Sequence, residues 1–244
     1  MSPGASHLSA SYHVLVVGSD LGGLMYAALA ARAGYRVGVI AHGMKPNTYR
    51  CEGHPFVRRP ERFYGFSTSP TISKVFGDLS LGMEMRNRPQ PVDPSLQFVT
   101  PTRRIDLARR PDRWRREIDR ELGDAGAPLM AFERWAEQWS AETERVLAST
   151  TPLPPSGLRA GRLYAQAIEG CEQLLDDESG HGQNPLMTRH DGATARAIVE
   201  AALRHLVSVQ PYPLSPLTLA RLWTHLRAGV YHMPGGRDGL KELF

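Results

Sequence analysis

The chain has 244 residues, of which 41% are hydrophobic and 22% are charged, and its formal net charge is +4. This composition is typical of a soluble globular protein, and the length allows one large domain or two small ones. The sequence contains no run of about 18 apolar residues, so we expect no membrane-spanning helix.

The cysteine content and the first residues indicate a cytoplasmic protein. Cys51 and Cys171 are far apart and have no C-x-x-C spacing, which excludes a disulfide framework and fits a reducing compartment. Residues 1–10 lack an apolar segment preceded by positive charge. We therefore expect a polar leader there and not a signal peptide.

The first predicted elements form a strand–helix–strand unit over residues 12–41. Residues 13–17 are a Val-rich run that ends at a glycine, which is typical of a buried parallel strand entering a tight turn. Residues 24–33 are rich in alanine and contain no β-branched residue, so they favour a helix, and Gly34 is placed to end it. Residues 35–40 form a second apolar strand. The unit has the length of a parallel strand pair joined by a helical crossover.

The rest of the chain is predicted to be mainly helical. Apolar periodicity and the positions of Pro and Gly predict these elements in chain order: a loop-like stretch over 43–65, a short helix and a turn over 71–85, a hairpin around a Pro-Thr turn over 97–107, helices over 111–122 and 128–148, a break over 150–161, helices over 163–175 and 193–209, an extended stretch over 210–216, a helix over 217–227, a short strand over 229–233, and a glycine turn that opens a last helix.

The turn after the first strand matches the dinucleotide-binding fingerprint G-x-G-x-x-G only in part. Gly18 and Gly23 occupy the first and third glycine positions, whereas Asp20 stands at the second. The fingerprint also has an acidic residue at the end of the second strand, where this chain has Ala41 followed by His42.

Both departures disfavour a bound dinucleotide. The middle glycine lets the backbone approach the pyrophosphate, and a carboxylate about 4 Å from a phosphate charge is repelled by roughly 4 kcal/mol at an effective dielectric constant of about 20. The missing acid removes hydrogen bonds to the ribose that are worth about 1.5–3 kcal/mol each. The glycines that remain in the turn, Gly18, Gly22 and Gly23, have a second interpretation that involves no ligand. Close packing between the helix and the strand would also require glycine at these positions.

Three stretches together resemble the phytoene desaturases and the related FAD-dependent amine oxidase-like flavoproteins. These are VVGSDLGGLMYAALAARAGYRVGVI (16–40), the region 52–107 with its Pro-Thr turn, Leu-Gly turn and hairpin, and GVYHMPGGRDGLKELF (229–244). The resemblance implies an α/β fold: a Rossmann-like FAD/NAD(P)-binding βαβ domain into which a helical substrate or cap domain is inserted. The implied domains are 1–96, 97–228 and 229–244. Members of the family are about twice as long, so the chain corresponds to their N-terminal half.

The resemblance also implies FAD as the cofactor and a set of positions that would hold it. The implied cofactor-binding residues are Gly18, Ser19, Asp20, Leu21, Gly22, Gly23, Ala41, His42, Arg50, Gly235 and Gly236. Arg50 is what remains of the family's Gly-Gly-Arg turn, because residues 45–50 read KPNTYR. Three altered positions around one ligand predict relaxed selection for FAD.

Two hypotheses for the function follow. In the first, the chain is an oxidoreductase half that pairs with a separate C-terminal half, or with a second copy, and acts on a hydrophobic polyene or isoprenoid, with the helical cap facing the substrate or a membrane surface. In the second, the chain is a non-catalytic pseudoenzyme or partner-binding module. The sequence indicates no catalytic residue and no metal site, and the isolated chain is expected to be inactive. Nucleic acid is not expected as a partner, because the arginines of residues 103–120 alternate with acidic residues.

Overall fold

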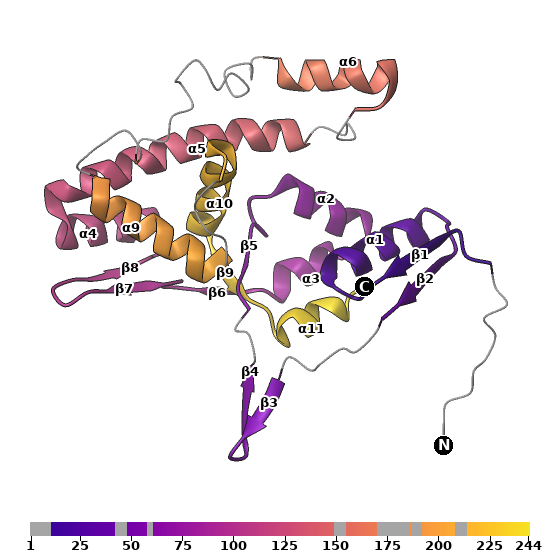
Figure 1. The fold of residues 1–244 in the computed structure, drawn as a ribbon, viewed down its shortest axis with the longest axis horizontal. Helices are drawn as coiled ribbons and strands as arrows, with labels where there is room; N and C mark the ends of the chain where they lie inside the picture. Colours follow the sequence, from indigo (N-terminus) through magenta and orange to yellow (C-terminus); the bar gives the residue numbers. More distant parts are fainter. Residues whose placement is uncertain are drawn as a thin grey trace. The chain divides into compact units, whose positions relative to one another are not determined.

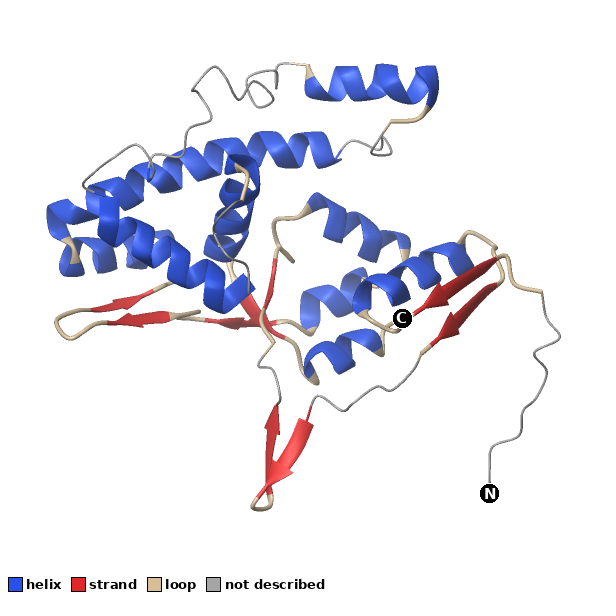
Figure 2. Cartoon of the chain, viewed as in Figure 1, coloured by secondary structure: helices blue, strands red, loops and turns tan. Residues whose placement is uncertain are grey.

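The protein is described by a computed structural model that covers residues 11–41, 48–57, 61–148, 155–169, 186, 192–207 and 214–244. The fold is mixed α/β, with many helices and several small sheets (Figures 1 and 2). The elements are β1 (Val14–Val17), α1 (Leu21–Arg32), β2 (Val37–Ile40), β3 (Thr48–Cys51), β4 (His54–Val57), β5 (Phe63–Tyr64), α2 (Pro70–Asp78), α3 (Gly82–Asn87), β6 (Gln90–Val92), β7 (Gln97–Val99), β8 (Arg104–Asp106), α4 (Pro111–Glu121), the 3-10 turn η1 (Gly123–Gly126), α5 (Ala127–Ala148), α6 (Gly157–Ile168), α9 (Ala193–Ala202), the π-helical segment η4 (Leu203–Val207), α10 (Pro216–Ala228), β9 (Val230–His232) and α11 (Gly236–Lys241).

The chain divides into two compact units. The first unit comprises Met1–Glu61, Ser73–Gln90 and His232–Phe244, and the second comprises Arg62–Ile72 and Pro91–Tyr231. Among the described residues, no helix is both long and apolar enough to cross a membrane.

The first unit begins with the expected strand–helix–strand arrangement. β1 and β2 pair in parallel, with Val14 opposite Val37 and Val17 opposite Ile40. The crossover helix α1 contacts both strands and also α11. It ends at Arg32 and is followed by Gly34, whose φ of +89° is a left-handed conformation that glycine adopts without strain.

Part of the predicted loop over residues 43–65 is a hairpin. β3 and β4 pair in antiparallel fashion, and Glu52 and Gly53 at the turn both have positive φ. The rings of Tyr49 and Phe56 stack across the hairpin with their centroids 5.6 Å apart. The loop expectation, which rested on the many Pro, Gly and Arg residues of this stretch, was wrong here. Pro55 is compatible with a strand because, within the described residues, β3 and β4 form a sheet of two strands only.

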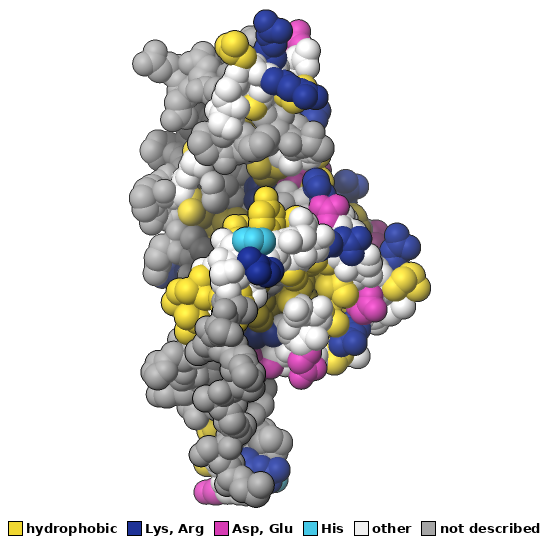
Figure 3. All heavy atoms as spheres, turned by 90° about the vertical axis from the view of Figure 1, so that its right-hand side faces the viewer, with side chains coloured by type: hydrophobic (Ala, Val, Ile, Leu, Met, Phe, Trp, Pro, Cys, Tyr) yellow, Lys and Arg dark blue, Asp and Glu magenta, His cyan; other side chains and the backbone are white. Residues whose placement is uncertain are grey.

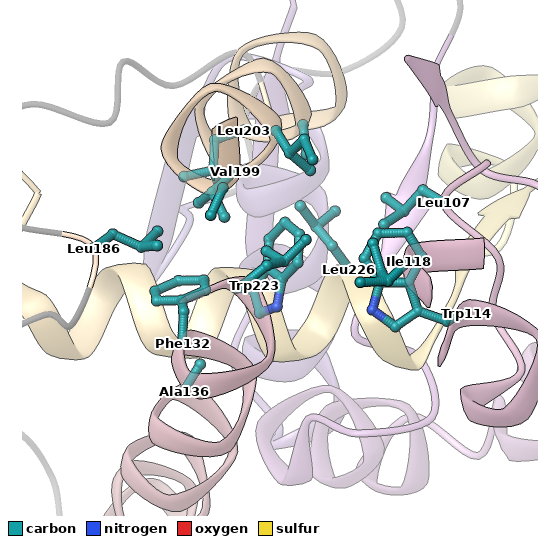
Figure 4. Close-up of a cluster of buried hydrophobic side chains, with 14 of the residues drawn as sticks. Leu107, Trp114, Ile118, Phe132, Ala136, Leu186, Val199, Leu203, Trp223 and Leu226 are labelled. Atoms are coloured by element: carbon teal, nitrogen blue, oxygen red, sulfur yellow. The ribbon is translucent and has the colours of Figure 1, made fainter. Parts of the chain in front are cut away.

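The second unit is built on helices α5 and α10, which make the most extensive contact between elements of the chain. Their interface is part of a buried cluster, drawn in Figure 4, to which α4 and α9 also contribute. Phe132 of α5 meets Trp223 of α10 edge to face, with the ring centroids 5.6 Å apart. Each such fully buried side chain contributes about 1.5–3 kcal/mol to folding.

The expected hairpin over 97–107 is confirmed as β7 and β8. Phe98 pairs with Ile105, and the turn is closed by the Thr100 backbone amide, which donates to the Arg103 carbonyl oxygen at 2.9 Å. Most predicted helices are also present, but the one predicted over 193–209 changes from α-helix to π-helix at Leu203. The predicted helix over 163–175 begins earlier, at Gly157, and its last residues lie outside the described part of the chain.

The C-terminal strand, glycine turn and helix form as the sequence predicts. β9 lies between β5 and β6 in a three-stranded sheet, with Tyr231 opposite Phe63. The strand therefore does not pair with β1 or β2; the segment reaches the strand–helix–strand unit through α11, which contacts α1. Gly239 is required for this turn, because a Cβ atom there would overlap the Pro234 carbonyl oxygen.

Candidate functional site

The turn between β1 and α1 has the backbone geometry that its two outer glycines predict. Gly18 has a φ of +112°, and its amide donates to the Ile40 carbonyl oxygen at 2.8 Å, which ties the turn to β2. A Cβ atom on Gly23 would lie 3.3 Å from Val16 Cγ1 and 3.5 Å from the Gly18 carbonyl oxygen. The positive φ of Gly18 and the close approach of helix and strand at Gly23 therefore account for the two glycines without a ligand. Gly22 has open space around its Cα atom.

Asp20 is the N-cap of α1. Its Oδ1 atom accepts a hydrogen bond from the Gly23 backbone amide at 2.9 Å, and its backbone carbonyl accepts one from Leu24 at 3.0 Å. A carboxylate in this position satisfies an amide that has no partner within the helix, and its charge is favourable beside the positive end of the helix dipole. Leu21 begins the helix and Ser19 lies between Gly18 and the cap. The anion-binding end of α1 thus already holds an anion supplied by the chain.

The other predicted cofactor positions are distributed over the first unit. Ala41 follows β2 and is exposed, and its side chain offers no acceptor for a ribose hydroxyl. Arg50 lies on β3, opposite Pro55 of the hairpin. His42 lies outside the described residues.

The second glycine turn, at Gly235 and Gly236, is also closed by a carboxylate. Both glycines have positive φ, +75° and +62°, and they lead into α11. The backbone amide of Arg237 donates to Glu61 Oε2, and the Arg237 guanidinium forms an ion pair with Glu61 Oε1 at 3.0 Å. Since α11 contacts α1, two helices whose first turns are occupied by internal carboxylates are neighbours in this unit.

The second unit contains a series of buried, hydrogen-bonded polar side chains that the sequence did not indicate as a site. His225 on α10 lies with Nδ1 2.6 Å from Thr68 Oγ1 and Nε2 2.8 Å from Oε1 of Glu144 on α5. Arg221, one helical turn before His225, donates to the same carboxylate oxygen at 2.5 Å. Because a carboxylate only accepts, Nε2 carries the hydrogen and the Thr68 hydroxyl donates to Nδ1 of the neutral ring.

Thr68, His225 and Glu144 are bonded in the order of a hydroxyl nucleophile, its base and an orienting acid. The electrostatic environment of His225 opposes that role. Burial lowers the pKa of His225, Glu144 raises it and Arg221 lowers it, and the net pKa is below the ordinary histidine value. A lowered pKa weakens the imidazole as a base. The pKa of the neighbouring Tyr64 is raised by its burial, against the opposing charge of Arg221. We interpret the cluster as a junction that holds the Thr68 segment to α5 and α10.

His225 is buried, with 4% of its surface exposed. Its partners are 157 and 81 residues away along the chain, so local spacing carries no signal for this cluster. Among the described residues there is also no group of three or more His, Cys, Asp or Glu side chains that could hold a metal ion.

Comparison of the chain with protein-family models and with curated proteins gave no match. The resemblance to flavoproteins therefore rests on the residues of this chain.

Replacing Asp20 tests the cap. Asp20→Ala should lower the free energy of unfolding by about 1 kcal/mol, because the Gly23 amide loses its acceptor, whereas Asp20→Asn keeps an oxygen in place and should lose less. Urea denaturation of the wild type and the two variants measures both values. Equal stability of Asp20→Ala and the wild type would contradict the assignment of the cap.

The lowered pKa of His225 predicts a loss of stability in acid. The unfolded chain takes up a proton near the ordinary pKa of 6.5, whereas the folded chain takes it up only at a lower pH, so protonation favours unfolding as the pH falls below 6.5. Thermal melts at a series of pH values should show this decline, and the decline should be smaller in His225→Gln. An identical pH dependence in both proteins would argue against a buried neutral His225.

Proposed function

We propose that the chain is the N-terminal half of a phytoene desaturase-like FAD-dependent oxidoreductase, degenerate in its own cofactor turn and completed by a partner half. The first unit would belong to a Rossmann-like dinucleotide-binding domain, and the helical second unit would face a hydrophobic substrate of the polyene or isoprenoid kind. The proposal is supported by the parallel β1–α1–β2 unit, by the geometry of Gly18 and Gly23, and by the glycine turn beside α11.

The observation that carries the proposal is the uncovered face of the β1–β2 sheet. The register places Leu15 beside Gly38 and Val17 beside Ile40 on one face. Leu15 is 55% exposed, Val17 82% and Ile40 51%. Parallel strands are normally covered on both faces and paired within larger sheets. In the space-filling view of Figure 3, hydrophobic side chains likewise reach the surface among charged ones.

We propose as the occupant of this face a polypeptide that supplies further strands and a covering helix, as the second half of such a flavoprotein would. Three large apolar side chains in contact with water are unfavourable by about 25 cal/mol per Å² of exposed surface. Covering them provides the free energy for association with the partner.

A second candidate function, a non-catalytic partner-binding module, is favoured by the two carboxylate caps. Asp20 and Glu61 occupy the positions at the starts of α1 and α11 where a helix would otherwise offer free amides to a phosphate. The association surface is common to both candidates. Binding of FAD in the completed assembly separates them.

The uncovered sheet face should make the isolated chain associate and bind an apolar dye. Leu15→Lys combined with Val17→Lys should reduce both dye fluorescence and the mass measured by light scattering, because the charges oppose burial of that face. Tyr26→Lys, which changes a 57% exposed ring on α1, is the matched control and should leave both unchanged. A monodisperse wild-type monomer without dye binding would contradict the proposed partner surface.

The isolated chain should be colourless after purification, because Asp20 repels a pyrophosphate and Ala41 cannot bind a ribose. Asp20→Gly combined with Ala41→Glu should tighten FAD binding in a titration followed by flavin fluorescence. Each restored hydrogen bond to a charged group is worth about 1.5–3 kcal/mol, which is at least tenfold in affinity. Stoichiometric flavin absorbance that survives gel filtration of the wild type would contradict this prediction.

A further inference from the structure

The helical second unit contains a cavity of about 550 Å³ between α4, α5 and α10. This volume is within the range of about 300–1,000 Å³ that is usual for small-molecule sites. The walls come from the start of α4, the first half of α5 and the second half of α10. The apolar part of the lining includes Pro111, Trp114, Met130 and Trp223.

The charged lining of the cavity is strongly positive. Five arginines and two glutamates line it, an excess of three positive charges: Arg109, Arg110, Arg115, Arg134, Arg227, Glu133 and Glu137. Arg227 is paired with Glu133 at 2.6 Å, and Arg110 is paired with Asp112 at 2.9 Å. Arg115 and Arg134 are exposed, and within the described part of the chain no hydrogen bond or ion pair engages either guanidinium.

Three buried polar atoms of the lining residues lack a hydrogen-bond partner within the described structure. They are Nε1 of Trp114, Nε1 of Trp223 and Oγ1 of Thr224. Both tryptophans are only 1% exposed, so water does not reach most of their surface. Figure 4 shows both indole nitrogens on the side of the cluster that is turned away from Val199 and Leu203. Buried donors without an acceptor are rare in folded proteins, and indole nitrogens can only donate.

The start of α4 adds little to this preference. Arg110 is the N-cap residue and its side chain makes no capping hydrogen bond, but the carboxylate of Asp112 in the first turn accepts a hydrogen bond from the Arg113 backbone amide. The guanidinium groups and the unpartnered donors are therefore what favours a ligand that accepts hydrogen bonds and carries negative charge.

We propose that this cavity binds a small phosphate ester, with the phosphate facing the arginines and the unpartnered donors, and an apolar or aromatic body against Pro111 and Met130. An excess of three positive charges matches a doubly charged phosphate better than a single carboxylate. Arginine holds phosphate oxygens through paired N–H donors. The proposal does not rest on the cofactor turn or on the β1–β2 face of the first unit, because every residue it uses belongs to the second unit.

The test is calorimetric titration of the full chain with 1-naphthyl phosphate, alongside 1-naphthol and inorganic phosphate. We expect saturable binding of the ester that weakens with added salt, and weaker binding of either part alone. Arg115→Gln combined with Arg134→Gln should weaken the ester by about tenfold or more, since hydrogen bonds to charged groups are strong. Arg159→Gln changes an exposed arginine of α6 that does not line the cavity and should leave binding unchanged.

Thr224→Val supplies a second measurement that does not depend on the exposed arginines. The substitution keeps the shape of the side chain and removes an unpartnered hydroxyl, so the free protein should be at least as stable as the wild type while the ester binds more weakly. Absence of saturable binding at millimolar ester would overturn the proposal. So would equal affinity for 1-naphthol, or equal affinity of the wild type and the double arginine variant.

Discussion

A backbone amide at the start of a helix must find an acceptor, and this requirement governs the chemistry of the first unit. The chain meets it from within: Asp20 accepts from Gly23 at the start of α1, and Glu61 accepts from Arg237 at the start of α11. Both helices therefore form without a ligand. In a flavoprotein of the proposed kind, a dinucleotide phosphate would have to compete with Asp20 for the amides at the start of α1.

The second unit shows the opposite situation. Its cavity is lined by donors that lack acceptors, on Trp114, Trp223 and Thr224, and by two arginines without an ion pair in the described structure. Its core is otherwise well packed, with Phe132 and Trp223 in edge-to-face contact between α5 and α10. Unpartnered donors beside a dense core are costly to folding, and a ligand that accepts hydrogen bonds removes that cost. Anion binding is thus favoured in the helical unit and opposed at the glycine turn.

Local patterns predicted most of the described elements, because they depend on neighbours in the sequence. The β1–α1–β2 unit follows from apolar runs around an alanine-rich helix, and the hairpin of Phe98 and Ile105 from its Pro-Thr turn. The hairpin around Gly53 was missed because the many Pro, Gly and Arg residues of that stretch indicated a loop. Asp20 could have been identified as a helix cap, since aspartate before a helix is a standard start signal, but its charge toward a cofactor was considered alone. The residues of the His225 cluster and of the arginine-lined cavity are far apart in the sequence, so no periodic pattern in the sequence predicts either feature.

The glycines of the first turn show why a retained fingerprint is weak evidence for a retained cofactor. Gly18 is favoured by its positive φ, and Gly23 by the close approach of Asp20 and Val16, so the fold by itself accounts for both glycines. Positions that only a ligand would constrain are different: Asp20 and Ala41 stand where the fingerprint has a glycine and an acid. Changing Asp20 alone to glycine would let a phosphate approach the backbone, but it would also remove the cap of α1. The ribose would still lack an acceptor, because Ala41 would be unchanged. For this reason the two positions have to be restored together before an effect on FAD binding can be interpreted.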